Sequence, residues 1–152
     1  MKTRTMLFAA LVILLALTLL GGCGAGKYVP KPNEEVYGTW INKSISPQKE
    51  VDTPDGWKQY GLISDPNPES EGTGQITSKW TDSEGNVWYK TLGTVTAGNY
   101  KGSKFQTLTK LSKSGTVKES VSLTVEEFDS SGYPTKIDPK EMLYSLYYRT
   151  EK

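Results

Sequence analysis

Turn signals recur through most of the chain and leave only short segments between them. They occur, in order, at Pro54-Asp55-Gly56, Ser83-Glu84-Gly85-Asn86, Ser114-Gly115 and Ser131-Gly132. The intervening segments are rich in Val, Ile, Thr, Tyr and Trp, and none shows the apolar spacing of a convincing amphipathic helix. Short β-prone runs between glycine-containing turns are typical of antiparallel sheets. The sequence therefore predicts an all-β domain.

We expect about seven strands, with boundaries good to a few residues. They span 35–43, 56–63, 75–82, 86–95, 103–112, 116–127 and 142–150. The two long connections are 44–55 and 64–74, and the second is acidic and rich in Pro and Gly, so we expect a mobile surface loop there. A meander of this length closes into a small barrel or folds into a β-sandwich, because open sheet edges promote aggregation.

The clearest alternation of apolar and polar residues lies in KESVSLTVEEF. One face of this expected strand carries Val117, Glu119, Val121, Leu123 and Val125, and the other carries Lys118, Ser120, Ser122, Thr124 and Glu126. Glu119 does not fit the apolar face. It is either a buried acid of raised pKa or the sign of a register slip or bulge, and we favour the slip or bulge. The adjacent pair Glu126-Glu127 is expected to end the strand at the surface.

A hairpin is expected around Asp82 to Asn86, with Trp80 entering the turn and Trp88 leaving it. The register of that turn decides whether the two tryptophans meet, and the sequence leaves it open. The acidic turn has some likeness to a calcium loop, but it lacks the spacing and the terminal glutamate of an EF-hand. Ordinary turn chemistry explains it without a metal.

The first residues have the layout of an export signal. Lys2 and Arg4 precede an apolar run from Met6 to Leu20, which is too short to span a bilayer comfortably. Leu20-Gly21-Gly22-Cys23 follows and resembles the lipobox of bacterial lipoproteins. The resemblance implies cleavage before Cys23, the only cysteine of the chain, and attachment of lipid to its thiol. The alternatives are a plain secretory signal with a chance cysteine and an uncleaved anchor.

The expected organisation is a signal peptide over 1–22, a lipidated cysteine and flexible tether over 23–34, and one domain over 35–152. Without Lys2 and Arg4, 16 basic residues face 17 acidic ones, a net charge of −1, so we expect no nucleic-acid partner. There is no histidine, and the lone cysteine is used for lipid, so we expect no metal site and no cofactor. The lipid implies export and anchoring to the cell membrane or outer membrane, on its periplasmic or surface side.

Glu35-Val36-Tyr37-Gly38-Thr39-Trp40, followed by antiparallel hairpins, resembles the start of lipocalin-like (calycin) barrels. The resemblance implies that the tryptophan of the Gly-x-Trp pattern packs across the closed end of the barrel, against a basic residue near the end of the last strand. Here Gly38, Trp40 and Arg149 match that signature. The wider pattern, TPDGWKQY, KWTDSEGNVWYK and YPTKIDP with LYSLYYR, resembles small bacterial lipocalin-like lipoproteins of unassigned function. Unlike a full lipocalin, the sequence has no helix segment after Arg149, which places a roomy cavity in doubt.

Two functions remain open for such a barrel. The first is a non-enzymatic protein that binds a small hydrophobic or amphipathic ligand at the cell envelope. The aromatic residues expected to line its cavity are Trp57, Trp80, Trp88, Tyr89, Phe105, Tyr144, Tyr147 and Tyr148. The second is a structural or interaction lipoprotein whose barrel is filled by its own side chains and which binds an envelope protein partner. An enzyme is not expected, because no histidine is present and no converging carboxylates are evident.

Overall fold

The computed structural model describes residues 28–43, 47–130 and 134–150. The expected signal peptide and Cys23 lie outside these residues. The described part of the chain contains eight strands and no helix, so it has no helix that could cross a membrane. The strands are β1 (Gly38–Ile41), β2 (Lys49–Thr53), β3 (Gly56–Tyr60), β4 (Ser70–Thr81), β5 (Val87–Ala97), β6 (Lys104–Leu111), β7 (Val117–Phe128) and β8 (Pro134–Arg149).

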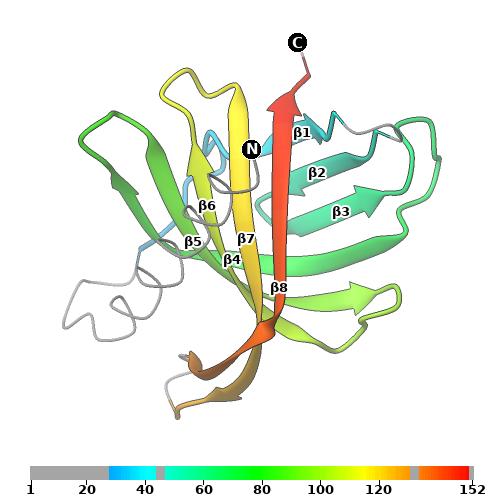
Figure 1. Ribbon diagram of the computed structural model, residues 1–152, viewed down its shortest axis with the longest axis vertical. Helices are drawn as coiled ribbons and strands as arrows, with labels where there is room; N and C mark the ends of the chain where they lie inside the picture. The colour runs from blue at the N-terminus through cyan, green and yellow to red at the C-terminus, as the bar shows by residue number, and fades with distance from the viewer. Residues whose placement is uncertain (1–27, 44–46, 131–133, 151–152) are drawn as a thin grey trace.

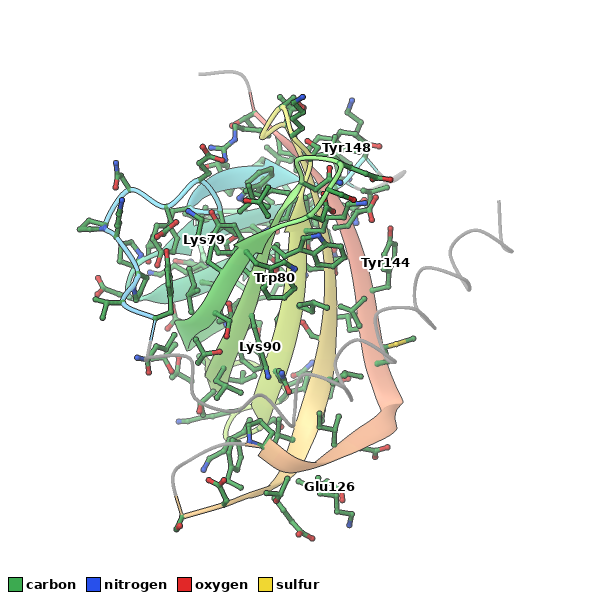
Figure 2. The ribbon with its side chains drawn as sticks, turned by 90° about the vertical axis from the view of Figure 1, so that its left-hand side faces the viewer. Lys79, Trp80, Lys90, Glu126, Tyr144 and Tyr148 are labelled. Atoms are coloured by element: carbon green, nitrogen blue, oxygen red, sulfur yellow. The ribbon has the colours of Figure 1, made fainter. Side chains whose placement is uncertain are left out.

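The strands form a closed antiparallel barrel in which each pairs with its neighbour in sequence and β8 returns to β1 (Figure 1). Trp40 pairs with Arg149 and Ile41 with Tyr148, and these two pairs close the barrel. The predicted all-β meander is therefore confirmed, as a barrel and not as a sandwich. The end of β7 and the start of β8 form a bent extension beyond the barrel, with Glu126 at its far end (Figures 1 and 2). Lys136 pairs there with Glu126 at 2.5 Å.

Two stretches expected to be connections are strands. β2 lies inside 44–55, and β4 begins at Ser70, inside 64–74. Both were missed because their sequences, KEVDT and SEGTG, carry charges or glycines where a half-buried strand carries large apolar residues. The glycines have a packing role: a Cβ on Gly72 would lie 2.6 Å from the Thr94 carbonyl oxygen and 2.8 Å from Nε1 of Trp57. They bring β4 close enough to accommodate the large indole of Trp57.

The orientation of β7 is the main difference from a conventional amphipathic strand. Its polar residues Lys118, Ser120 and Ser122 face the inside of the barrel, and Val121 faces outward. Leu123 contacts both the outer cluster and the cavity. The pairing of β7 is continuous on both sides from Val117 to Leu123, so the expected slip or bulge at Glu119 is wrong. Glu119 lies on the outer face because the whole strand has its polar side turned inward. The bulges of the β7–β8 pair begin only after Leu123.

Buried apolar side chains form two separate clusters. The first fills the end of the barrel where β1 begins and contains Val36, Trp40, Ile76, Tyr89, Leu111 and Tyr147. The second lies on the outer face of β5 to β7 and contains Trp88, Leu108, Val121 and Leu123, with Trp80, Ile137, Met142 and Tyr144 packed against it. Beyond the first cluster, the inside of the barrel contains polar side chains and a cavity.

The β4–β5 hairpin settles the register that the sequence left open. Trp80 and Trp88 are direct partners across the hairpin, and their rings stack at 6.0 Å with an interplanar angle of 4°. Asp82 organises the turn between them: its carboxylate accepts hydrogen bonds from the backbone amides of Glu84 and Asn86 and from Nε1 of Trp88, at 2.8–2.9 Å. Hydrogen bonds within the turn thus explain its acidic residue.

Candidate functional site: a cavity with a charged floor

The three residues of the Gly-x-Trp and arginine pattern come together at one end of the barrel. Trp40 is fully buried, and the guanidinium of Arg149 lies 4.4 Å from the centre of its ring. Arg149 also donates hydrogen bonds to three backbone carbonyls, those of Glu35, Tyr37 and Gly115. Gly38 has φ of +137°, and a Cβ there would lie 3.1 Å from an Arg149 nitrogen, so a side chain would displace the arginine. We call this the closed end.

The segment 28–34, expected as part of a flexible tether, is packed onto the closed end. Its anchor is Glu34, which is 4 % exposed. The Glu34 carboxylate accepts hydrogen bonds from Lys79 at 2.6 Å, from Tyr89 at 3.3 Å, from the hydroxyl of Tyr28 and from the amide of Lys31. Burial by itself would raise the pKa of Glu34, but the hydrogen bonds from Lys79, Tyr28 and Lys31 lower it to about 2.

Glu34→Gln is expected to lower the free energy of unfolding at neutral pH by about 2 kcal/mol, because Lys79 loses its charged partner. The pKa of Glu34 is depressed in the folded state, so its stabilising effect is complete above its ordinary value of 4.5 and is lost as the pH falls towards 2. Urea unfolding between pH 2 and 7 checks this. The control is Glu35→Gln, the same change at the exposed neighbour. A difference between Glu34→Gln and wild type that persists unchanged at pH 2 would contradict it.

A cavity of about 580 Å³ runs from the closed end to the opposite end of the barrel. Its mouth is bordered by Glu69 of the β3–β4 connection, Tyr100 of the β5–β6 connection and Leu143 of β8. Tyr100 and Leu143 are 72 % and 60 % exposed, which is unusual for large apolar side chains and places apolar surface at the entrance. The volume lies in the range of ordinary small-molecule sites.

Three of the eight aromatic residues expected to line a cavity do so: Trp57, Phe105 and Tyr147. Trp57 and Phe105 meet edge to face, with ring centres 6.0 Å apart. The room for this pair comes from glycines on β4 and β5, since a Cβ on Gly93 would lie 2.4 Å from the Phe105 ring. The pair forms an aromatic wall between the mouth and the floor.

The other five aromatics are placed elsewhere. Tyr89 is buried at the closed end, where its hydroxyl bonds Glu34. Trp80 and Trp88 stack on the outer face, and Tyr144 projects from β8 away from the barrel (Figure 2). Tyr148 adjoins the inward-facing Tyr147 on β8, so it also faces outward, with Lys43 Nζ 4.2 Å from its ring centre. Strand parity separates the four outward-facing residues from the cavity, whereas Tyr89 faces inward but lies in the apolar cluster at the closed end.

The floor of the cavity is a cluster of charged side chains. Lys118 of β7 is 2 % exposed, and its ammonium lies 2.5 Å from a carboxylate oxygen of Glu50 and 2.5 Å from one of Asp52, both on β2. The same ammonium lies 5.1 Å from the ring centre of Trp40 and 5.0 Å from that of Tyr147. One cation is thus held by two carboxylates over two aromatic rings. We call Lys118, Glu50 and Asp52 the floor cluster.

When both carboxylates of the floor cluster are ionised, they carry two negative charges, and Lys118 neutralises only one. Burial and the neighbouring Glu50 raise the pKa of Asp52 and Lys118 lowers it, which leaves it at about 7. Burial opposes the charge of Lys118, but the two acids raise the pKa of its ammonium above the ordinary value. Lys118 therefore stays charged, while Asp52 exchanges a proton near neutral pH.

Above the floor, hydroxyl groups on the inner faces of β6 and β7 pair with one another. Thr107 bonds Ser122 at 2.8 Å, and Thr109 bonds Ser120 at 3.0 Å. These hydroxyls line the cavity and supply polar contacts, and Phe105 of the aromatic wall follows them along the inner face of β6. The inside of the barrel therefore combines a charged floor, a row of hydroxyls and an aromatic wall.

The sequence did not single out the floor cluster. Lys118 belongs to the polar face of β7, which reads as a solvated face, and Glu50 and Asp52 fall in a predicted connection. One signal was present: Glu50 and Asp52 are two residues apart and share a strand face, as do the alternating polar residues of β7. Only barrel closure, which places β2 across from β7, brings these charges together.

The fold and the site define a closed eight-stranded antiparallel barrel with an internal cavity and a charged floor. Comparison with protein-family models, curated proteins and solved structures finds no match to this chain. Within residues 28–43, 47–130 and 134–150, no three His, Cys, Asp or Glu side chains gather in an arrangement that could hold a metal ion. The cavity with its charged floor is therefore the candidate functional site.

Proposed function

We propose that this protein is a lipid-anchored envelope protein whose barrel binds a small amphipathic molecule without transforming it. The observation that carries the proposal is the cavity of about 580 Å³, open at one end and lined by both aromatic and polar side chains. Pockets for small ligands combine apolar walls with a few fixed polar groups, and eight-stranded barrels have room for one such ligand. A barrel filled by its own side chains, the alternative, would leave no space of this size.

The position of the N-terminal segment supports binding away from the membrane. Glu34 fixes residues 28–34 at the closed end, opposite the mouth. If Cys23 carries lipid, as the lipobox resemblance implies, the closed end lies nearest the anchor and the mouth opens away from the bilayer. A ligand could then enter from the surrounding aqueous space.

A non-enzymatic role is supported by the chemistry of the floor. Lys118 is the obvious nucleophile or base, but two carboxylates hold it as a cation. Its protonated amine has no free lone pair with which to react. The chain has no histidine to shuttle protons. The arrangement favours holding a charged group over activating a reaction.

The test is native mass spectrometry of the chain from Gly24 onward, purified gently, together with analysis of its organic extract. We expect a small molecule that survives buffer exchange and is lost in Ser145→Phe, which places a ring in the cavity. Leu146→Phe is the matched control, since Leu146 is the next residue on β8 and faces outward. A protein that is bare in every preparation, with no tryptophan fluorescence change against fatty acids, sterols, haem and amphipathic amines, would refute the proposal.

A further inference from the structure

The charges that line the cavity are unbalanced. Among the described lining residues, Glu50, Asp52 and Glu69 are acidic and Lys118 alone is basic. Two of the acids belong to the floor, and Glu69 lies near the mouth. A cavity with low-dielectric walls focuses the field of such an excess, so the path from the mouth to the floor attracts cations and repels anions.

Lys118 is an unsuitable receptor for an anionic ligand, because its ammonium is already occupied. It contacts both floor carboxylates at 2.5 Å and lies over the rings of Trp40 and Tyr147. Its side chain is 2 % exposed, whereas those of Glu50 and Asp52 are 20 % and 16 % exposed and border the cavity. The carboxylates therefore present the accessible charge at the floor.

Each carboxylate also retains acceptor capacity beyond its bond to Lys118. Glu50 contacts Lys118 through Oε1, and Asp52 contacts it through Oδ2. Glu50 and Asp52 also hydrogen-bond each other, and Tyr147 hydrogen-bonds Glu50. A carboxylate has about four acceptor sites on its two oxygens, so these contacts still leave capacity on each side chain. An ammonium group of a ligand could use the remaining sites and would offset the charge that Lys118 leaves uncompensated.

The walls above the floor suit the rest of such a molecule. Trp57, Phe105 and Tyr147 present aromatic surface within the same cavity, and the mouth adds the apolar side chains of Tyr100 and Leu143. Aromatic faces stabilise organic cations as well as apolar groups. The cavity thus matches an apolar body on its walls and a positive group at its floor.

We infer that the barrel receives an amphipathic organic cation, with a protonated or quaternary ammonium group against Glu50 and Asp52 and an apolar or aromatic body along Trp57 and Phe105. This inference rests on the proposed function and specifies its ligand class. It excludes fatty acids and other amphipathic anions as the preferred occupants, although these are common choices for an apolar cavity.

The titration of Asp52 gives the inference a second readout. The groups that face Asp52 are Glu50 on β2, Lys118 on β7, Tyr147 on β8 and Tyr37 before β1. Burial raises the pKa of both tyrosines, so they remain neutral below pH 8, and Lys118 remains charged. Asp52, with a pKa of about 7, therefore gains its charge between pH 6 and 8. Affinity for a quaternary ammonium ion should rise about tenfold over that interval.

The experiment is isothermal titration calorimetry of the full chain in lipid nanodiscs, with three water-soluble probes. The probes are benzyltrimethylammonium, neutral benzyl alcohol and anionic phenylacetate. We expect the quaternary ammonium to bind about tenfold or more tighter than either other probe, and Asp52→Asn to remove most of that preference. Asp52→Asn keeps the Lys118–Glu50 pair, so the fold is retained. The control is Asp55→Asn, the same charge change in the exposed β2–β3 turn.

The outcomes separate this inference from the proposal beneath it. Tighter binding of phenylacetate, or equal binding of all three probes with no effect of Asp52→Asn or of pH, would overturn the inference. If those probes are still excluded by Ser145→Phe, the cavity remains a binding site and only the ligand class is wrong. No binding of any probe, together with a bare protein in mass spectrometry, would overturn both.

Discussion

Lys118→Met is expected to lower the free energy of unfolding by about 4 kcal/mol at neutral pH, because removing one member of a buried ion cluster leaves the others uncompensated. Glu50 and Asp52 would then face each other in the barrel without Lys118 between them, and the pKa of Asp52 would rise further because Lys118 lowers it. A carboxylate whose folded pKa lies above its unfolded value destabilises the fold at higher pH. The deficit should therefore shrink as the pH falls towards 4. Urea unfolding at several pH values measures it.

Two further variants distinguish the loss of the ion cluster from a general destabilisation of the fold. Lys113→Met makes the same change in the exposed β6–β7 turn and should shift stability by less than about 0.5 kcal/mol. Adding Glu50→Gln and Asp52→Asn to Lys118→Met removes the unpaired charges and should recover most of the loss. A neutral effect of Lys118→Met, or a loss that Glu50→Gln and Asp52→Asn do not repair, would show that the floor cluster is not an electrostatic unit.

Trp40→Ala is expected to cost about 4 kcal/mol of unfolding free energy, the usual loss for deleting a large buried aromatic side chain. Trp40 has no exposed surface, and its Nε1 donates a hydrogen bond to the Val36 carbonyl at 2.9 Å. Its ring also contacts Arg149 from the closed end and Lys118 from the cavity. Its removal would open the closed end, take the indole away from Arg149 and leave Lys118 with the ring of Tyr147.

Trp80→Ala is the comparison for Trp40→Ala, because Trp80 is a tryptophan that stacks on Trp88 at the outer face and is only partly buried. We expect it to cost about half as much. Denaturant unfolding of both variants, followed by circular dichroism, gives the comparison. A Trp40→Ala loss no larger than that of Trp80→Ala would mean that the closed end adds little to the stability of the barrel.

The sequence predicted the parts of the fold that depend on local chemistry. Turn residues located most of the hairpins, and the Gly-x-Trp pattern with Arg149 pointed to residues that meet at the closed end. The prediction from sequence failed where the barrel places polar side chains on its inner face. β2 was read as a connection because Glu50 and Asp52 look like surface residues, although both face the cavity.

Five of the eight aromatics predicted to line the cavity do not, and four of them fail for a related reason. Aromatic side chains in a barrel were expected to fill its interior, but Trp80, Trp88, Tyr144 and Tyr148 lie on the outer face. Alternation along a strand shows which residues share a face, but it does not show which face turns inward. That choice depends on partners far away in sequence, such as the carboxylates of β2 that balance Lys118 on β7.

The shortest seam of the barrel lies between β1 and β8, where only two residue pairs are matched, whereas β7 and β8 are matched over most of their length. Few backbone hydrogen bonds can protect such a seam, so local opening of the barrel should begin there. The floor cluster crosses this line from the inside, since its acids lie on β2 and its lysine on β7, the strands flanking β1 and β8. The floor cluster therefore links the two sides of a sheet that is closed by few backbone pairs. Its ion pairs can form only after β1 and β8 have brought β2 and β7 together.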